Sequence, residues 1–133
     1  MIFVDTGAFF ALYYARDQHR AAAAATWPTL SKPLFTSNHV LDELASLLSR
    51  NIGYSVAVDR LSDIYASPTF EILRTTADDE KQALKRMRKF ADQSVSFTDC
   101  LSFTLMNRER LRTAFTFDRH FKTAGFEVIG PSE

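Results

Sequence analysis

The chain has 133 residues, a length that predicts one domain over 1–133 with a sizeable hydrophobic core. Its 16 basic and 16 acidic residues cancel, which excludes nucleic-acid binding through a global positive field and leaves only local basic patches. The single cysteine, Cys100, excludes an internal disulfide, and no apolar run is long enough to span a membrane. Because the N-terminus lacks a signal-peptide pattern, we expect a soluble cytoplasmic protein.

The N-terminal half of the chain alternates short apolar runs with helical patterns. Residues 1–4 are too few for a helix and predict a buried strand that ends at Asp5. The patterns that follow predict helices over 7–14 and 17–30, a strand over 33–36, helices over 39–50 and 55–66, and a strand over 70–73.

The C-terminal half begins with an amphipathic helix predicted over 78–91, which has acidic residues at its start and basic residues near its end. One face of this helix is a basic stripe made of Lys81, Lys85, Arg88 and Lys89. A solvated helix face is the first interpretation of this basic stripe, and contact with phosphates is the alternative.

Ser96 is the expected N-cap of the next helix, whose apolar residues surround most of its circumference and predict burial. A strand over 113–117, a turn or short helix over 119–123 and a strand over 126–129 complete the chain. The alternation of strands and helices predicts an α/β domain with a mainly parallel sheet covered on both faces.

In such a domain the functional crevice lies outside the carboxyl ends of the strands. Four acids are predicted to reach this edge from distant segments: Asp5, Glu43, Asp99 and Asp118. Clustered carboxylates repel one another, so their convergence implies one or two divalent cations. Oxygen ligands suit Mg²⁺ or Mn²⁺, which can activate water for attack on a phosphodiester.

Three assignments among the polar residues need separate arguments. On a helical wheel Glu43 lies at the edge of the apolar face whereas Asp42 faces water, so Glu43 is the candidate ligand. Thr116 lies two residues before Asp118, where its hydroxyl could orient that carboxylate or a metal-bound water. Asp99 alone could equally be a helix cap, and His19 is expected to be a packing or surface residue.

Four segments together resemble the PIN domain, most closely the small single-domain toxins of the VapC type: IFVDTGAFFAL, NHVLDELASLL, SFTDCLSFTLM and TFDRHF. They follow the order and spacing of the family and cover nearly the whole chain. The resemblance implies a three-layer α/β/α sandwich and an endoribonuclease that depends on Mg²⁺ or Mn²⁺. It also implies an antitoxin whose tail occupies the active-site groove, and a homodimer.

The positions that match the acidic site of the family are Asp5, Glu43, Asp99 and Asp118, and Thr116 matches its hydroxyl. Gly7 stands where many members have Ser, so a hydroxyl role at that position is not expected here.

Two other functions remain as alternatives. Phosphotransfer through an aspartyl intermediate would require an Asp-x-Asp pair after the first strand, where this chain has Asp5-Thr6-Gly7. It would also require a lysine after a late strand, where Asp118 stands. A catalytically silent PIN-fold binding module is the second alternative, although such a module would not need all four acids.

Overall fold

The computed structural model describes residues 1–130 and contains a five-stranded sheet in which all neighbouring strands are parallel. The strands are β1 (Ile2–Val4), β2 (Leu34–Ser37), β3 (Phe70–Leu73), β4 (Thr113–Phe115) and β5 (Glu127–Ile129). Their order across the sheet is β3-β2-β1-β4-β5. The predicted parallel sheet is therefore confirmed.

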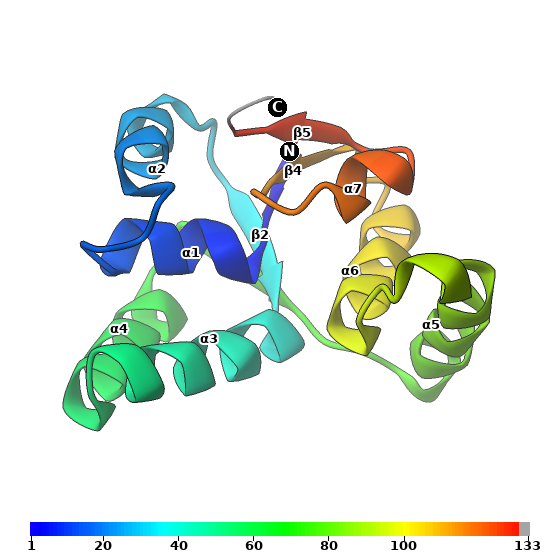
Figure 1. Cartoon of the computed structure of the whole chain (residues 1–133), viewed down its shortest axis with the longest axis horizontal. Coiled ribbons are helices and arrows are strands. Elements are labelled where there is room, and N and C mark those ends of the chain that lie inside the picture. The colour runs from blue at the N-terminus through cyan, green and yellow to red at the C-terminus, as the bar shows by residue number, and fades with distance from the viewer. Residues whose placement is uncertain (131–133) are drawn as a thin grey trace.

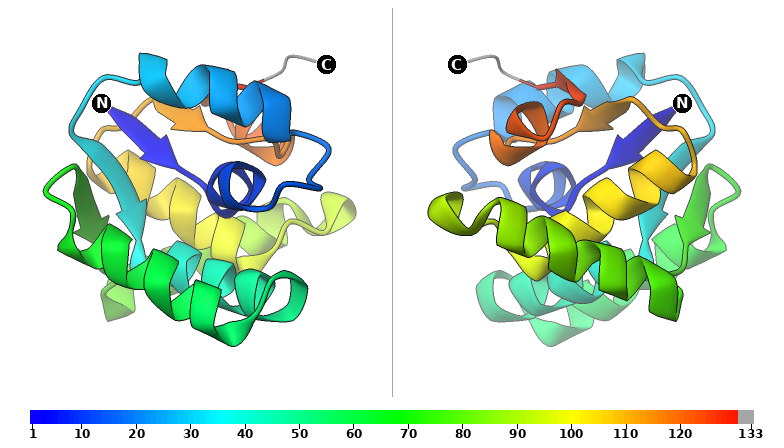
Figure 2. Two further views of the ribbon diagram at one scale, coloured as in Figure 1. Left: turned by 90° about the vertical axis from the view of Figure 1, so that its left-hand side faces the viewer. Right: turned by 90° about the vertical axis from the view of Figure 1, so that its right-hand side faces the viewer.

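Helices cover both faces of this sheet. They are α1 (Thr6–Tyr13), α2 (Arg20–Thr26), α3 (Asn38–Asn51), α4 (Tyr54–Ala66), α5 (Ala77–Lys89), α6 (Phe97–Arg108) and α7 (His120–Thr123). Helices α1, α2 and α4 lie to one side of the sheet and α5, α6 and α7 to the other, as Figures 1 and 2 show. This arrangement confirms the three-layer α/β/α sandwich. Within residues 1–130 no helix combines the length and the apolar character needed to cross a membrane.

The buried elements are those that the apolar patterns predicted. All three residues of β1 are buried, which suits a central strand with helices on both faces. In α6 every residue from Asp99 to Met106 is buried, so this helix lies inside the molecule as its all-round apolar character indicated. A carboxylate at the start of such a helix is withdrawn from bulk water.

Two predicted elements are shorter in the structure. The helix predicted over 17–30 covers only α2, because the carboxylate of Asp17 accepts a hydrogen bond from the backbone N–H of His19 and holds a turn there. At its other end Pro28 lies in a separate 3₁₀ turn, Trp27–Thr29. The strand predicted over 113–117 ends at Phe115, which leaves Thr116 and Phe117 in the loop that follows β4.

The strand order determines where a site can form. From β1 the chain moves outward through β2 to β3, then crosses back to β4 on the other side of β1 and ends at β5. The carboxyl ends of β1 and β4 therefore flank the point where the direction of winding reverses, which is the usual position of a ligand crevice in an open parallel sheet.

Candidate active site

Asp5 directly follows β1 at this reversal point. Its backbone N–H donates to the carbonyl oxygen of Phe115 at 3.1 Å, which ties the end of β1 to the end of β4. Only 4% of the residue is exposed. The hydroxyl of Thr116 donates to one carboxylate oxygen, Oδ2, at 2.8 Å, whereas the buried Oδ1 has no hydrogen-bond partner among residues 1–130.

Thr116 contacts a different carboxylate from the one expected. Its hydroxyl donates to Asp5 and accepts a hydrogen bond, 3.0 Å long, from the backbone N–H of Asp118. It therefore fixes the Asp5 carboxylate and the course of the following loop. The expected contact with the Asp118 carboxylate assumed that the side-chain alternation of the predicted strand over 113–117 continues to Asp118, whereas the strand ends at Phe115.

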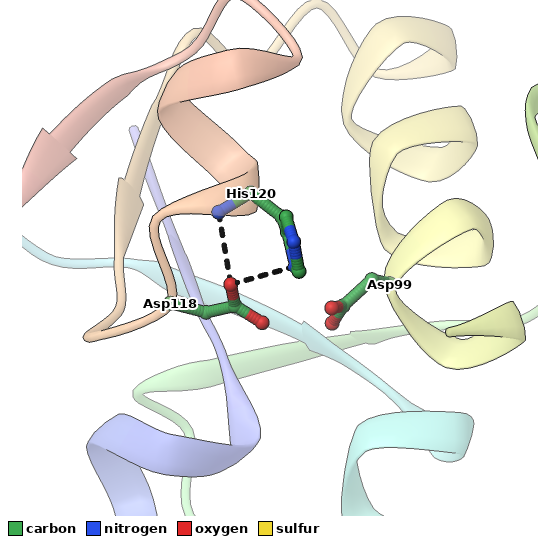
Figure 3. Close-up of side chains that lie close together, drawn as sticks. All are labelled: Asp99, Asp118 and His120. Atoms are coloured by element: carbon green, nitrogen blue, oxygen red, sulfur yellow. Dashed lines mark hydrogen bonds and ion pairs between the residues drawn. The ribbon is translucent and has the colours of Figure 1, made fainter. Parts of the chain in front are cut away.

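Asp118 is held by His120, a residue that the sequence argument missed. The backbone N–H of His120 donates to Asp118 Oδ1 at 2.8 Å, and the ring Nδ1 lies 3.1 Å from the same oxygen. Figure 3 shows the imidazole standing beside the space between Asp118 and Asp99. The only sequence signal was the short spacing of a histidine two positions after a candidate ligand.

Asp99 lies in the first turn of α6, where Ser96 is the N-cap as predicted. The Ser96 hydroxyl accepts a hydrogen bond from the Asp99 backbone N–H at 3.1 Å. Only 8% of Asp99 is exposed, and its carboxylate faces Asp118 (Figure 3). One ligand atom each from Asp99, Asp118 and His120 lie within 4.8 Å of one another, a group that could hold a metal ion.

All four predicted acids line one hollow of about 770 Å³ at the carboxyl edge of the sheet. Glu43 reaches it from α3, whose N-cap Ser37 ends β2. Glu43 and Asp42 are both exposed, and only Glu43 lines the hollow. The structure therefore brings Asp5, Glu43, Asp99 and Asp118 together and leaves Asp42 outside.

Burial, together with the charges of neighbouring acids, raises the pKa of two of these acids. Burial raises the pKa of Asp99 from 3.8 to about 9, and the negative charge of Asp5 is the next largest cause. Burial also raises the pKa of Asp5 from 3.8 to about 7, against the opposing effect of the hydrogen bond from Thr116. Ionisation of both carboxyl groups is therefore unfavourable unless a cation neutralises their charge.

The donor set suits a divalent cation. The unpartnered Asp5 Oδ1 is a buried oxygen that lacks a donor among residues 1–130, and a cation would satisfy it. Asp5, Asp99, Asp118 and Glu43 supply the oxygen ligands that Mg²⁺ and Mn²⁺ prefer. His120 is a nitrogen donor, in contrast to these oxygen ligands. Its Nδ1 already contacts Asp118, so its role here is to orient that carboxylate.

Comparison with known proteins agrees with this geometry. The sequence profile described as PIN domain matches residues 2–127. The chain belongs to the PIN-domain family. Its sequence is 36% identical over 131 residues to the 23S rRNA-specific endonuclease VapC20 of Mycobacterium tuberculosis, covering 98% of this chain and 99% of that protein. It is also 29% identical to Ribonuclease VapC26 of the same organism, over 89% of this chain and 87% of that protein.

Solved structures show the same PIN fold. The crystal structure of M. tuberculosis VapC20, described as a sarcin–ricin loop cleaving toxin, superposes with a TM-score of 0.93 at 34% identity and covers 98% of this chain and 100% of that one. A toxin–antitoxin complex from Klebsiella pneumoniae superposes with a TM-score of 0.72 at 15% identity, over 100% of this chain and 99% of that one, and shares the fold.

Proposed function

We propose that this PIN-domain protein is an endoribonuclease that hydrolyses RNA phosphodiester bonds with Mg²⁺ or Mn²⁺, and that it is the toxin of a toxin–antitoxin pair. The observation that carries the proposal is the convergence of Asp5, Asp99, Asp118 and Glu43 on one hollow at the carboxyl edge of the sheet. An ion held by these carboxylates would supply the means to lower the pKa of an attacking water molecule and to offset charge on the phosphate.

Other residues of the chain hold three of the four carboxylates in place for this ion. Thr116 fixes one oxygen of Asp5, and His120 fixes one oxygen of Asp118. The Asp99 side chain is carried by the first turn of a buried helix. Each of these three carboxylates is therefore positioned by its surroundings before substrate arrives, which is how a metal site gains a defined geometry.

Purified protein should cut RNA only when Mg²⁺ or Mn²⁺ is present, and excess chelator should stop the reaction. Gel analysis of labelled RNA with each metal and with chelator measures this directly. Undiminished cutting in chelator would contradict the proposal, since it would indicate a metal-free mechanism or a contaminating nuclease.

The proposed substrate is ribosomal RNA. Similarity over the whole chain to a protein named as a 23S rRNA-specific endonuclease supports this choice. Sequencing of RNA 5′ ends after brief induction in cells, followed by cleavage of purified ribosomes, should locate the cut. Cleavage confined to other RNAs would retain the nuclease and reject ribosomal RNA as its target.

A cytoplasmic location, a cognate antitoxin and a homodimer complete the proposal. A toxin requires a neutralising partner, and resemblance to a VapC toxin over the full length supports one here. Helix α4 exposes the side chains of Tyr54, Val58 and Tyr65, which suit a protein interface better than open water. Light scattering of the purified protein, and co-purification with the product of the adjacent gene, test the two assemblies.

A further inference from the structure

His19 and Phe117 form a stacked pair at the rim of the active-site hollow. Their ring centroids are 4.4 Å apart and the rings are 3° from parallel. His19 comes from the turn that precedes α2, and Phe117 comes from the loop after β4, so the pair joins segments from opposite ends of the chain. From the sequence, His19 is expected to be a packing or surface residue. Neither ring belongs to the group of candidate metal ligands.

Both rings are held by their surroundings. The backbone N–H of His19 donates to the Asp17 carboxylate at 2.8 Å, which fixes the turn that carries the imidazole. The Phe117 ring packs edge-on against buried Phe115, with centroids 5.7 Å apart and planes 67° from parallel. The pair is therefore a preformed aromatic surface.

This aromatic pair separates two hollows. It lines the active-site hollow, and it also lines a second hollow of about 350 Å³. Asp118 and Arg119 belong to the walls of both, so the second hollow begins directly beside a candidate metal ligand. A volume of this size lies within the range of small-molecule sites, about 300 to 1,000 Å³.

The walls of the second hollow combine apolar and charged groups. Phe126 and Val128 supply apolar surface, and Glu127 supplies a carboxylate that can accept from a base amino group. Arg119 and Lys122 line this hollow and form no ion pair among residues 1–130. Stacking surface, a hydrogen-bond acceptor and free cations for phosphate are what single-stranded RNA uses.

We propose that the second hollow binds the unpaired base of a nucleotide that flanks the cleaved bond, stacked on the His19–Phe117 pair. Arg119 and Lys122 contact the phosphate that follows that base. This subsite rests on the proposed ribonuclease activity and explains how the enzyme holds a chosen bond over the carboxylates. In this proposal His19 and Phe117 contact a base beside the cleaved bond and not the reacting phosphate. They therefore position the RNA and take no part in the chemical step.

The test begins with an RNA in which the wild-type cut has been mapped. The same RNA is then synthesised with an abasic nucleotide at each of the two positions beside the cleaved bond. Phe117→Leu and His19→Leu should each lower kcat/KM on intact RNA by roughly 5- to 100-fold, the effect of losing one stacked base. At one of the two positions the abasic RNA should lower wild-type cleavage equally.

Non-additivity is the decisive readout. On that abasic RNA the two variants should lose no more than about twofold further, because the stacking that they remove is already absent. Phe117→Tyr and His19→Phe keep an aromatic ring and should retain activity within about threefold. Leu84→Ala truncates a side chain that is 49% exposed on α5 and should leave cleavage unchanged.

Different failures have different meanings. Equal losses on intact and abasic RNA would assign the rings a structural role and overturn the subsite. Unchanged cleavage by folded Phe117→Leu and His19→Leu variants would also overturn the subsite. Should Phe117→Leu unfold in a thermal melt, His19→Leu carries the test, since His19 lies in a surface turn. Wild-type protein that cuts no RNA with either metal would overturn the proposed function itself.

Discussion

The starts of α5 and α6 are built alike and differ in what their acids meet. Each has a hydroxyl residue as N-cap and an aspartate three positions later, Thr76 with Asp79 in α5 and Ser96 with Asp99 in α6. Each cap hydroxyl accepts a hydrogen bond from the backbone N–H of its aspartate, at 3.2 and 3.1 Å. Both aspartates are buried, with 4% and 8% exposed.

Their carboxylates have opposite surroundings. Asp79 accepts from the backbone N–H of Thr76 at 2.9 Å and pairs with Arg108, so it completes a capping box and its charge is neutralised. Asp99 instead faces Asp5 and Asp118, which raise its pKa beyond the effect of burial. The partners of a buried acid, and not its place in a helix, thus distinguish a structural cap from a candidate ligand.

The largest expected effect separates these two acids by activity. Asp99→Asn should lower RNA cleavage by at least about 100-fold, more than is usual for groups that merely support a ligand. Because asparagine is neutral at every pH, the variant avoids the cost of protonating the Asp99 carboxyl or of burying its charge beside Asp5 and Asp118, so the melting temperature of the metal-free protein should hold or rise. Cleavage rates and thermal melts of the same sample measure both. A large fall in the melting temperature of metal-free Asp99→Asn would instead indicate that Asp99 is a structural cap, as Asp79 is.

Two adjacent acids on α3 extend the comparison to another helix. Glu43→Gln should lower cleavage by about 10- to 100-fold, because Glu43 lines the hollow. Asp42→Asn should leave most of the activity, since Asp42 lies outside that hollow. Steady-state cleavage by the two variants decides the point. Equal losses would show that proximity to the hollow does not identify the ligand.

The stability of the metal-free protein should depend on pH in a direction set by Asp5 and Asp99. Their raised pKa values, about 7 and about 9, mean that the folded state binds more protons than the unfolded state above their ordinary value of 3.8. The stability that the raised pKa values of Asp5 and Asp99 contribute to the folded state is fully present below pH 3.8 and is lost as pH rises towards 9. From pH 5 to about 9 the melting temperature of wild type should therefore fall more steeply than that of Asp99→Asn, so the advantage of the variant should grow as pH increases. Parallel curves would contradict the raised pKa of Asp99.

A smaller effect is expected at Asp79. Asp79→Asn removes the ion pair with Arg108, whose side chain is 34% exposed, so the free energy of unfolding should fall by only about 1 kcal/mol. Cleavage should stay within about twofold of wild type. Urea unfolding and a cleavage assay on the same protein measure the two quantities. A loss of activity without a loss of stability would place Asp79 in the functional group.

The smallest effect concerns the exposed face of α5. Charge reversal at Lys85 and Lys89, both exposed in the basic stripe, should weaken RNA binding and lower the salt slope by about 0.7 for each phosphate that is no longer neutralised. Lys32→Glu, an exposed lysine outside the stripe, is the matched control. Binding isotherms at several salt concentrations give the slope. A slope equal to that of the control would assign the stripe to solvated surface.

The fold and the meeting of the acids could be predicted because each depends on local patterns. A short apolar run ending at Asp5 indicated a buried strand, and parallel strands share a carboxyl edge. The helical wheel distinguishes Glu43, at the edge of the apolar face, from Asp42, which faces water. These arguments require only the period of a helix and the direction of a strand.

Two of the missed contacts depend on the meeting of distant segments, and the third depends on a tight turn. Thr116 reaches Asp5 because Val4 is in register with Phe115 across β1 and β4, and strand register is not visible in one sequence. His120 contacts Asp118 through a tight turn that follows no hydrophobic period. The stacking of His19 on Phe117 likewise depends on two loops whose meeting point only the folded chain defines.

The hydrogen bond between Thr116 and Asp5 joins residues 111 positions apart, and it has a consequence for synthesis on the ribosome. β1 is made first, but its neighbour β4 and the residues that fix Asp5 and carry Asp118 are made last. At about 5 to 20 residues per second, the first strand waits roughly 5 to 25 s for its partner. A chain interrupted before Asp118 carries only part of the carboxylate site, so interrupted translation yields fragments without the complete site.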